Sequence, residues 1–168
     1  MPVAATILNA GHWDAATACD TISLDHDARH RRRFNFVAAG GVAFLLDLPR
    51  ATVLMDGDGL LLDDGRIVAV RAAPEPLMEV RAPSPAAMLR LAWHIGNRHL
   101  PAELNGGVIR LRRDHVIRDM LVGLGAEVLD IDAPFIPEQG AYAGGGHGHS
   151  HGHGDDHAHS HRHHAHAH

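Results

Sequence analysis

Apolar residues in the first seventy positions occur in short runs separated by turn residues. Aliphatic residues fill the runs, and glycine, aspartate and proline stand between them, which is typical of short strands. We predict strands over 22–24, 34–37, 42–46, 60–62 and 67–70. Asp63-Asp64-Gly65 joins the last two as a hairpin turn, because glycine adopts a positive φ at little cost. This half of the chain is therefore predicted to be a small all-β domain.

Two prolines, Pro74 and Pro76, interrupt this pattern. Because proline has no N–H to give to a strand ladder, we predict a short stiff linker here. The linker divides the chain into a β-rich domain over 1–73, a second domain over 74–143 and a histidine-rich tail over 144–168.

The second domain combines strands with helical periodicity. A strand over 77–81 precedes Ser84-Pro85, an N-cap followed by proline at the first helical position. Apolar residues then recur at helical spacing as far as Ile95. Pro101 excludes the helical conformation for the residue before it, so the helix is predicted to end near 97–99.

A hairpin, a second helix and a final strand follow. Asn105-Gly106-Gly107 lies between two short apolar runs and predicts a turn, and Asp114 caps a helix with an apolar stripe ending at Leu124. The last strand is predicted over 127–131. Strand, helix, strand, strand, helix, strand is the order of a ferredoxin-like βαββαβ domain. The predicted fold class is therefore α+β.

The last part of the chain is unusually rich in histidine. Of 17 histidines, 11 lie between positions 147 and 168, among Gly, Ser, Ala and Asp. Such a segment has little apolar surface to bury, so we expect it to be disordered on its own. Clustered imidazoles favour nickel, copper, zinc or cobalt over magnesium or calcium. The candidate ligands are His147, His149, His151, His153, His157, His159, His161, His163, His164, His166 and His168.

A purification tag is the alternative explanation for this tail. A tag is usually an unbroken run, whereas this series is interrupted by Asp155, Asp156 and Arg162, among others. We therefore favour a segment that binds several exchangeable metal ions.

His99 is the main candidate ligand outside the tail. It follows Gly96-Asn97-Arg98 at the predicted end of the first helix, so its ring is expected to point outward or into an interface. His94 lies five positions earlier, about 140° around a helix, and does not share a face with His99. One histidine holds a transition metal weakly, whereas two copies related by a twofold axis supply two ligands. A capping or surface role is the alternative.

The remaining histidines fall among polar residues. His115 follows the N-cap Asp114 and is either solvated in the first turn or a metal ligand. His12, His26 and His30 are expected at the surface.

Two further features have both a structural and a functional interpretation. The arginines at positions 29, 31, 32 and 33 form a basic run, which is either a solvated segment or a docking patch for an acidic partner. Cys19, the single cysteine, is expected to be a small buried hydrophobic residue, with ligation of a soft metal as the alternative, and its being alone excludes an internal disulfide framework.

Charge and motif content exclude several classes of function. The formal net charge is −5, from 15 basic residues, all arginine, against 20 acidic ones, which argues against binding nucleic acid through a broad basic face. No apolar run approaches the roughly 18 residues of a membrane span, and the first residues do not resemble a signal peptide, so we expect a cytoplasmic protein without a membrane partner. Phosphate-loop, serine-hydrolase and zinc-protease motifs are absent, which predicts that the chain is not an enzyme.

An ordered series of short motifs runs through nearly the whole chain. They are Leu45-Leu46-Asp47-Leu48-Pro49 with Asp56-Gly57-Asp58, Asp64-Gly65-Arg66, Ala73-Pro74-Glu75-Pro76, Gly96-Asn97-Arg98-His99, Asp114-His115-Val116, Asp119-Met120-Leu121, Gly123-Leu124-Gly125, and Pro134-Phe135 through Gly140-Ala141-Tyr142. In this order they resemble the UreE family of urease accessory proteins, which are nickel metallochaperones.

The resemblance implies an amino-terminal domain of the type called peptide-binding in this family and a ferredoxin-like domain that binds metal and forms a homodimer. It implies that His99 is the key ligand and meets its symmetry mate at the dimer interface. Some members have a histidine at the position of Arg113, so ligation by His115 has weaker support here.

The implied function is delivery of Ni(II) to the urease apoprotein and its assembly complex through a GTPase partner. Zn(II), Cu(II) and Co(II) suit the same ligands. The alternative is a histidine-rich metal buffer or store without a delivery role. A zinc hydrolase is disfavoured, because a disordered tail does not hold water and substrate in fixed geometry.

Overall fold

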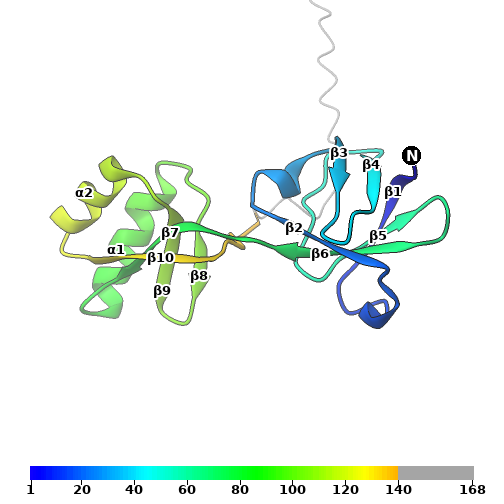
Figure 1. The fold of residues 1–168 in the computed structure, drawn as a ribbon. Coiled ribbons are helices and arrows are strands. Elements are labelled where there is room, and N and C mark those ends of the chain that lie inside the picture. Colours follow the sequence, from blue (N-terminus) through cyan, green and yellow to red (C-terminus); the bar gives the residue numbers. More distant parts are fainter. Residues whose placement is uncertain (140–168) are drawn as a thin grey trace, which may run out of the picture. The chain divides into compact units, whose positions relative to one another are not determined.

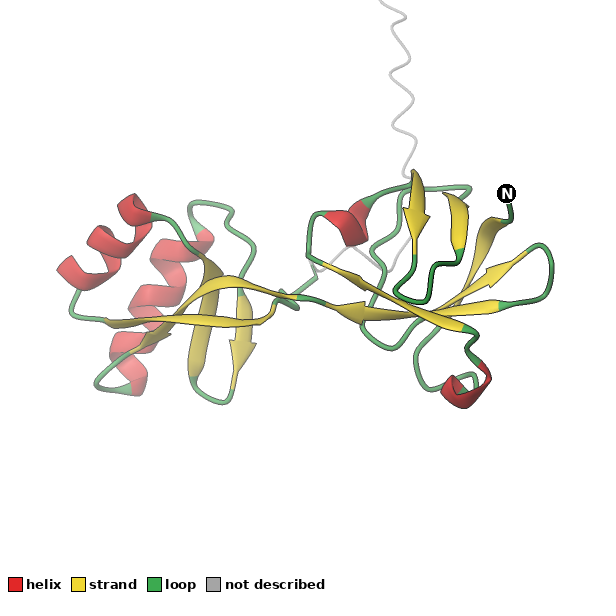
Figure 2. Ribbon diagram, viewed as in Figure 1, coloured by secondary structure: helices red, strands yellow, loops and turns green. Residues whose placement is uncertain are grey.

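The computed structural model describes residues 1–139, which form a six-stranded sheet, a four-stranded sheet and two α-helices (Figures 1 and 2). The predicted tail ligands from His147 to His168 lie outside the described residues. Within the described part, neither α-helix is long and apolar enough to cross a membrane.

The six-stranded sheet contains all five strands predicted in the first half of the chain. Its order is β2-β6-β5-β1-β4-β3. The elements are β1 (Val3–Leu8), η1 (Ala15–Thr17), β2 (Asp20–Leu24), η2 (Ala28–His30), β3 (Arg33–Val37), β4 (Ala43–Asp47), β5 (Gly59–Leu62) and β6 (Ile67–Ala72). β1 was not predicted, although three of its six residues, Val3, Thr6 and Ile7, are β-branched and favour a strand. It nevertheless lies inside the sheet, parallel to β4 and antiparallel to β5.

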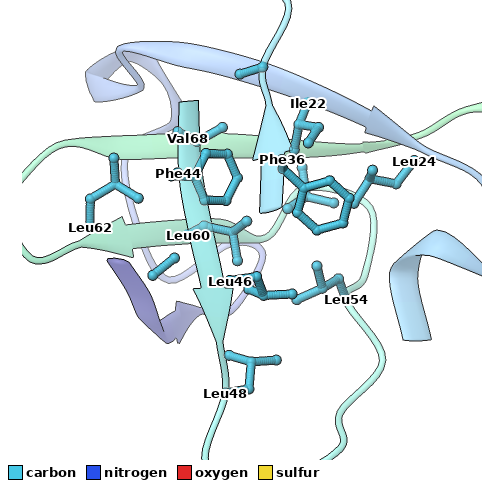
Figure 3. Packing of buried hydrophobic residues seen from close by; sticks show 13 residues of the cluster. Ile22, Leu24, Phe36, Phe44, Leu46, Leu48, Leu54, Leu60, Leu62 and Val68 are labelled. Carbon is cyan, nitrogen blue, oxygen red and sulfur yellow. The ribbon is translucent and has the colours of Figure 1, made fainter. Parts of the chain in front are cut away.

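The core of this sheet is aliphatic with a pair of phenylalanines. Phe36 and Phe44, on neighbouring strands, have ring centroids 5.9 Å apart. Around them pack fully or almost fully buried side chains from β2, β4, β5 and β6 and from the segments after β4 (Figure 3), including Ile22, Leu24, Leu46, Leu48, Leu54, Leu60, Leu62 and Val68.

The second sheet has the predicted order of strands and helices. Its elements are β7 (Pro74–Arg81), α1 (Pro85–Gly96), β8 (Glu103–Asn105), β9 (Val108–Arg112), α2 (His115–Gly123) and β10 (Glu127–Pro134). The strands are antiparallel in the order β10-β7-β9-β8. Both predicted N-caps are confirmed, since Ser84 Oγ accepts from the Ala87 N–H at 3.2 Å and Asp114 Oδ1 from the Ile117 N–H at 2.9 Å.

A second core joins the helices to this sheet. The helices contribute the buried residues Leu91, Ile95 and Leu121, and the strands contribute Met78, Val80, Ile109 and Leu111. These positions have the helical spacing and strand alternation seen in the sequence.

The predicted proline linker is wrong. β6 runs to Ala72, and β7 begins at Pro74 and pairs with β10 along its whole length. The Pro76 carbonyl oxygen accepts from the Arg113 N–H, on the side of β7 away from β10. The nitrogens of Pro74 and Pro76 point to that same side, so neither proline removes a hydrogen bond from the ladder with β10.

Three residues differ in burial from the sequence expectation. Arg29 is 1 % exposed and His26 9 %, although both were expected at the surface, whereas Cys19 is exposed rather than buried. Arg29 is buried because its guanidinium donates to the carbonyl oxygens of Leu54 and Phe135, and such partners offset the cost of removing a charge from water. His12 and His30 are exposed, as expected.

Candidate metal centre

The end of α1 places His99 on a tight turn. The Asn97 N–H bonds the Trp93 carbonyl oxygen at 3.0 Å, and the His99 N–H bonds the Gly96 carbonyl oxygen at 3.0 Å. The hydrogen-bond pattern therefore changes from i to i−4 in the helix to i to i−3 at His99, two residues before Pro101. This confirms the predicted end of the helix.

His99 has an unusual backbone conformation. Its φ is 53°, and it is the one non-glycine residue with a positive φ in the described part of the chain. The left-handed region crowds the β-carbon, and the position after a helix is usually taken by glycine for this reason. Because glycine would fit here with less strain, we infer that the imidazole itself is the reason for histidine at this position.

The imidazole of His99 is accessible. The residue is exposed, and its ring makes no hydrogen bond to any residue of 1–139. The neighbouring Arg98 turns back along the helix, where its Nη1 donates to the His94 carbonyl oxygen at 2.9 Å. The His99 ring is therefore free to bind a ligand from solvent or from another molecule.

Two large apolar side chains are exposed on α1. Leu89 is 73 % exposed and Trp93 64 %, and these two residues, with Arg90 and His94, line a shallow hollow. The His94 ring lies edge-on to Trp93, with centroids 5.0 Å apart. Large apolar side chains exposed side by side are typical of an interaction surface.

The structure does not group His99 with other candidate ligands. His115 is the exposed first residue of α2, and Arg113 beside it donates to the carbonyl oxygens of Leu77 and Ile131 at 3.2 and 3.1 Å. Arg113 therefore has a structural role between strands. Within residues 1–139, no group of three His, Cys, Asp or Glu side chains could hold one metal ion.

The positive φ of His99 was not predicted, although the sequence contains a signal for it. The chain must leave the helix before Pro101, and positions 97 to 100 contain no glycine to take the left-handed conformation. A left-handed residue at the end of this helix is then not a glycine.

Both parts of the chain are similar to known proteins of one family. Residues 4–73 match the model of the UreE urease accessory protein N-terminal domain, and residues 75–168 match that of its C-terminal domain. Three relatives are named urease accessory protein UreE. The one from Chelativorans sp. is 63% identical over 74% of this chain and 79% of its own length. The one from Rhodopseudomonas palustris is 55% identical over 79% of this chain and 61% of its own length, and the one from Bradyrhizobium sp. (strain BTAi1) 54% over 83% and 68%.

The two halves of the chain therefore match the N-terminal and the C-terminal domain of one family of proteins, in that order. The chain belongs to the UreE family of urease accessory proteins.

Proposed function

We propose that this protein is a metallochaperone that binds Ni(II) and delivers it to the urease assembly complex. The observation that carries the proposal is the exposed imidazole of His99, which has no partner in the described residues 1–139 and stands on a left-handed backbone. Imidazole nitrogen is a good ligand for Ni(II), and a site at the surface allows the ion to be passed on. The family membership supports the link to urease, with a GTPase of the assembly machinery as the expected partner.

A homodimer would complete the metal site. One imidazole binds a transition metal weakly, and a twofold axis near the end of α1 would bring the His99 residues of two protomers to one ion. The exposed Leu89 and Trp93 on the same helix supply an apolar surface that a second copy would cover. We propose that this face of α1 forms the dimer interface of the ferredoxin-like domain over 74–143.

The other predicted ligands would act as a reservoir. His115 and the histidines from His147 to His168 would raise the local concentration of metal, and the paired His99 residues would hold the ion for transfer. Zn(II), Cu(II) and Co(II) compete for the same nitrogens, so selection of Ni(II) would depend on geometry and metal supply. The proposal places the protein in the cytoplasm.

Urease activation in cells tests delivery. We expect cells that lack this protein to have low urease activity when nickel is limiting, and the wild-type gene to restore it. His99→Ala should restore little activity, whereas the control His94→Ala should restore most of it. Full urease activity without the protein at limiting nickel would leave a metal buffer as the better description.

A further inference from the structure

The outer edge of β3 is open for pairing. β3 is the last strand of its sheet and pairs with β4 on one side. The Arg32 carbonyl oxygen accepts from the Leu48 N–H at 2.9 Å, so the backbone groups of alternate residues from Arg32 onward face β4. The N–H and C=O groups of Arg33, Asn35 and Val37 therefore point away from β4.

Just after the end of β3, the outward side of the chain already forms one backbone hydrogen bond with another strand. Beyond the end of β3, the Ala39 N–H donates to the Thr21 carbonyl oxygen of β2 at 2.8 Å. From Val37 back to Arg33, no backbone group among residues 1–139 pairs with the outward groups. An edge in extended conformation with unpaired donors and acceptors is a template for an added strand.

Positive charge is concentrated where this edge begins. Arg31, Arg32 and Arg33 are exposed, on a chain whose formal net charge is −5. Arg33 lies 3.6 Å from Asp47, but no carboxylate in the described residues pairs with Arg31 or Arg32. The Arg31 guanidinium instead lies 5.7 Å from the centroid of the Phe34 ring. Two arginines are therefore available to an external anion.

Apolar side chains flank the same edge. Phe34 is 47 % exposed and Val37 68 %, and they lie on opposite faces of the strand. Apolar side chains of an added strand would pack against Phe34 or Val37, depending on the face on which they lie.

We propose that the β3 edge binds an extended acidic segment of a partner protein as an added strand, with Arg31 and Arg32 pairing its carboxylates. Outward main-chain donors and acceptors favour a peptide over a nucleic acid, whose backbone does not pair in a β ladder. The proposal concerns a surface separate from His99 and does not depend on nickel delivery.

Binding of a labelled synthetic peptide to the full-length protein tests the proposal. The probe is an alternating glutamate–valine peptide long enough to span β3, followed by fluorescence anisotropy, with the matched lysine–valine peptide as a control. We expect the acidic peptide to bind and the basic one not to bind. The double variant Arg31→Gln/Arg32→Gln should weaken binding about tenfold, because it removes two exposed ion pairs.

A second pair of variants tests the main-chain contacts. Asn35→Pro removes an outward N–H without removing a bond to β4, whereas Asn35→Ala loses the same side chain and keeps the N–H. We expect Asn35→Pro to bind the acidic peptide at least severalfold more weakly than Asn35→Ala, with equal circular dichroism spectra. If the proline variant is unfolded, the arginine variant decides the outcome. Equal binding of acidic and basic peptides, unchanged binding in the arginine variant, or tighter binding of a single-stranded DNA oligonucleotide than of the acidic peptide would overturn the proposal.

Discussion

Arg29 donates from its guanidinium to the carbonyl oxygen of Phe135, 106 residues further along the chain. Both side chains are almost completely buried. A second bond, from Nη1 to the Leu54 carbonyl oxygen at 3.3 Å, ties the same guanidinium to the segment after β4. Arg29 thus links three segments that are distant in sequence.

Arg29→Met should lower the free energy of unfolding by about 3 kcal/mol, because the carbonyl oxygens of Leu54 and Phe135 would stay buried without their donor. Urea denaturation of the metal-free protein measures the change. The control is Arg32→Met, since Arg32 is exposed, and there we expect a change within about 0.5 kcal/mol. Equal effects of the two variants would show that the buried bonds of Arg29 contribute little.

His26 should make stability depend on pH. Burial lowers the pKa of His26, and the nearby His30, Arg112 and Arg29 lower it further, while Glu75 opposes them. The unfolded chain then binds more protons than the folded protein as pH falls below about 6.5, so stability decreases there. The urea concentration at the midpoint of unfolding should be lower at pH 5 than at pH 7. In His26→Gln the difference between the two midpoints should be smaller.

The geometry around His26 supports this pH dependence. Its ring centroid lies 4.3 Å from that of His30 and 5.2 Å from that of Phe135. Its buried Nδ1 makes no hydrogen bond within residues 1–139 and lies 3.8 Å from Asp27 Oδ1. His12→Gln, at an exposed position, is the matched control and should leave the pH profile unchanged. A His26→Gln profile identical to that of the wild type would contradict this explanation.

His99→Gly should separate stability from metal binding. Glycine takes a positive φ without crowding a β-carbon, so we expect the free energy of unfolding in the presence of chelator to rise by about 1 kcal/mol. Nickel binding at this site should nevertheless be lost. His99→Ala should lose binding without the gain in stability. If His99→Gly is less stable than the wild type, the ring supports the fold, and the inference from its backbone is wrong.

Trp93→Glu should weaken the proposed dimer, because a carboxylate would replace the largest exposed apolar side chain of α1. Sedimentation velocity of the metal-free protein should show a shift toward monomer. Leu104→Glu is the control, since Leu104 is a 57 % exposed apolar residue on β8. An equal shift for both variants would place the interface elsewhere.

The fold was predictable where local patterns determine it. Alternation in β2 to β6, helical spacing in α1 and α2, and the capping residues Ser84 and Asp114 depend on neighbours in sequence. The burial of Arg29 was not predictable, because its partners come from Leu54 and Phe135. The prolines of β7 were misinterpreted for a similar reason, since the direction of their nitrogens depends on which side β10 pairs.

The sequence singled out His99 as a candidate ligand but did not predict its backbone conformation. The motif ending at His99 indicated the ligand, and Pro101 indicated the end of the helix. The positive φ of His99 was not predicted, although the absence of glycine from positions 97 to 100 is a sequence signal for a left-handed non-glycine residue there. The assignment of His99, His115 and the tail histidines as ligands stays a prediction.

Nickel titration combined with sedimentation tests the central claim most directly, on protein ending after Tyr142 so that the tail histidines do not contribute. We expect one tightly bound Ni(II) per dimer, lost in His99→Ala and retained in His94→Ala. One bound ion per dimer that survives His99→Ala unchanged would contradict the role of His99 as the metal ligand.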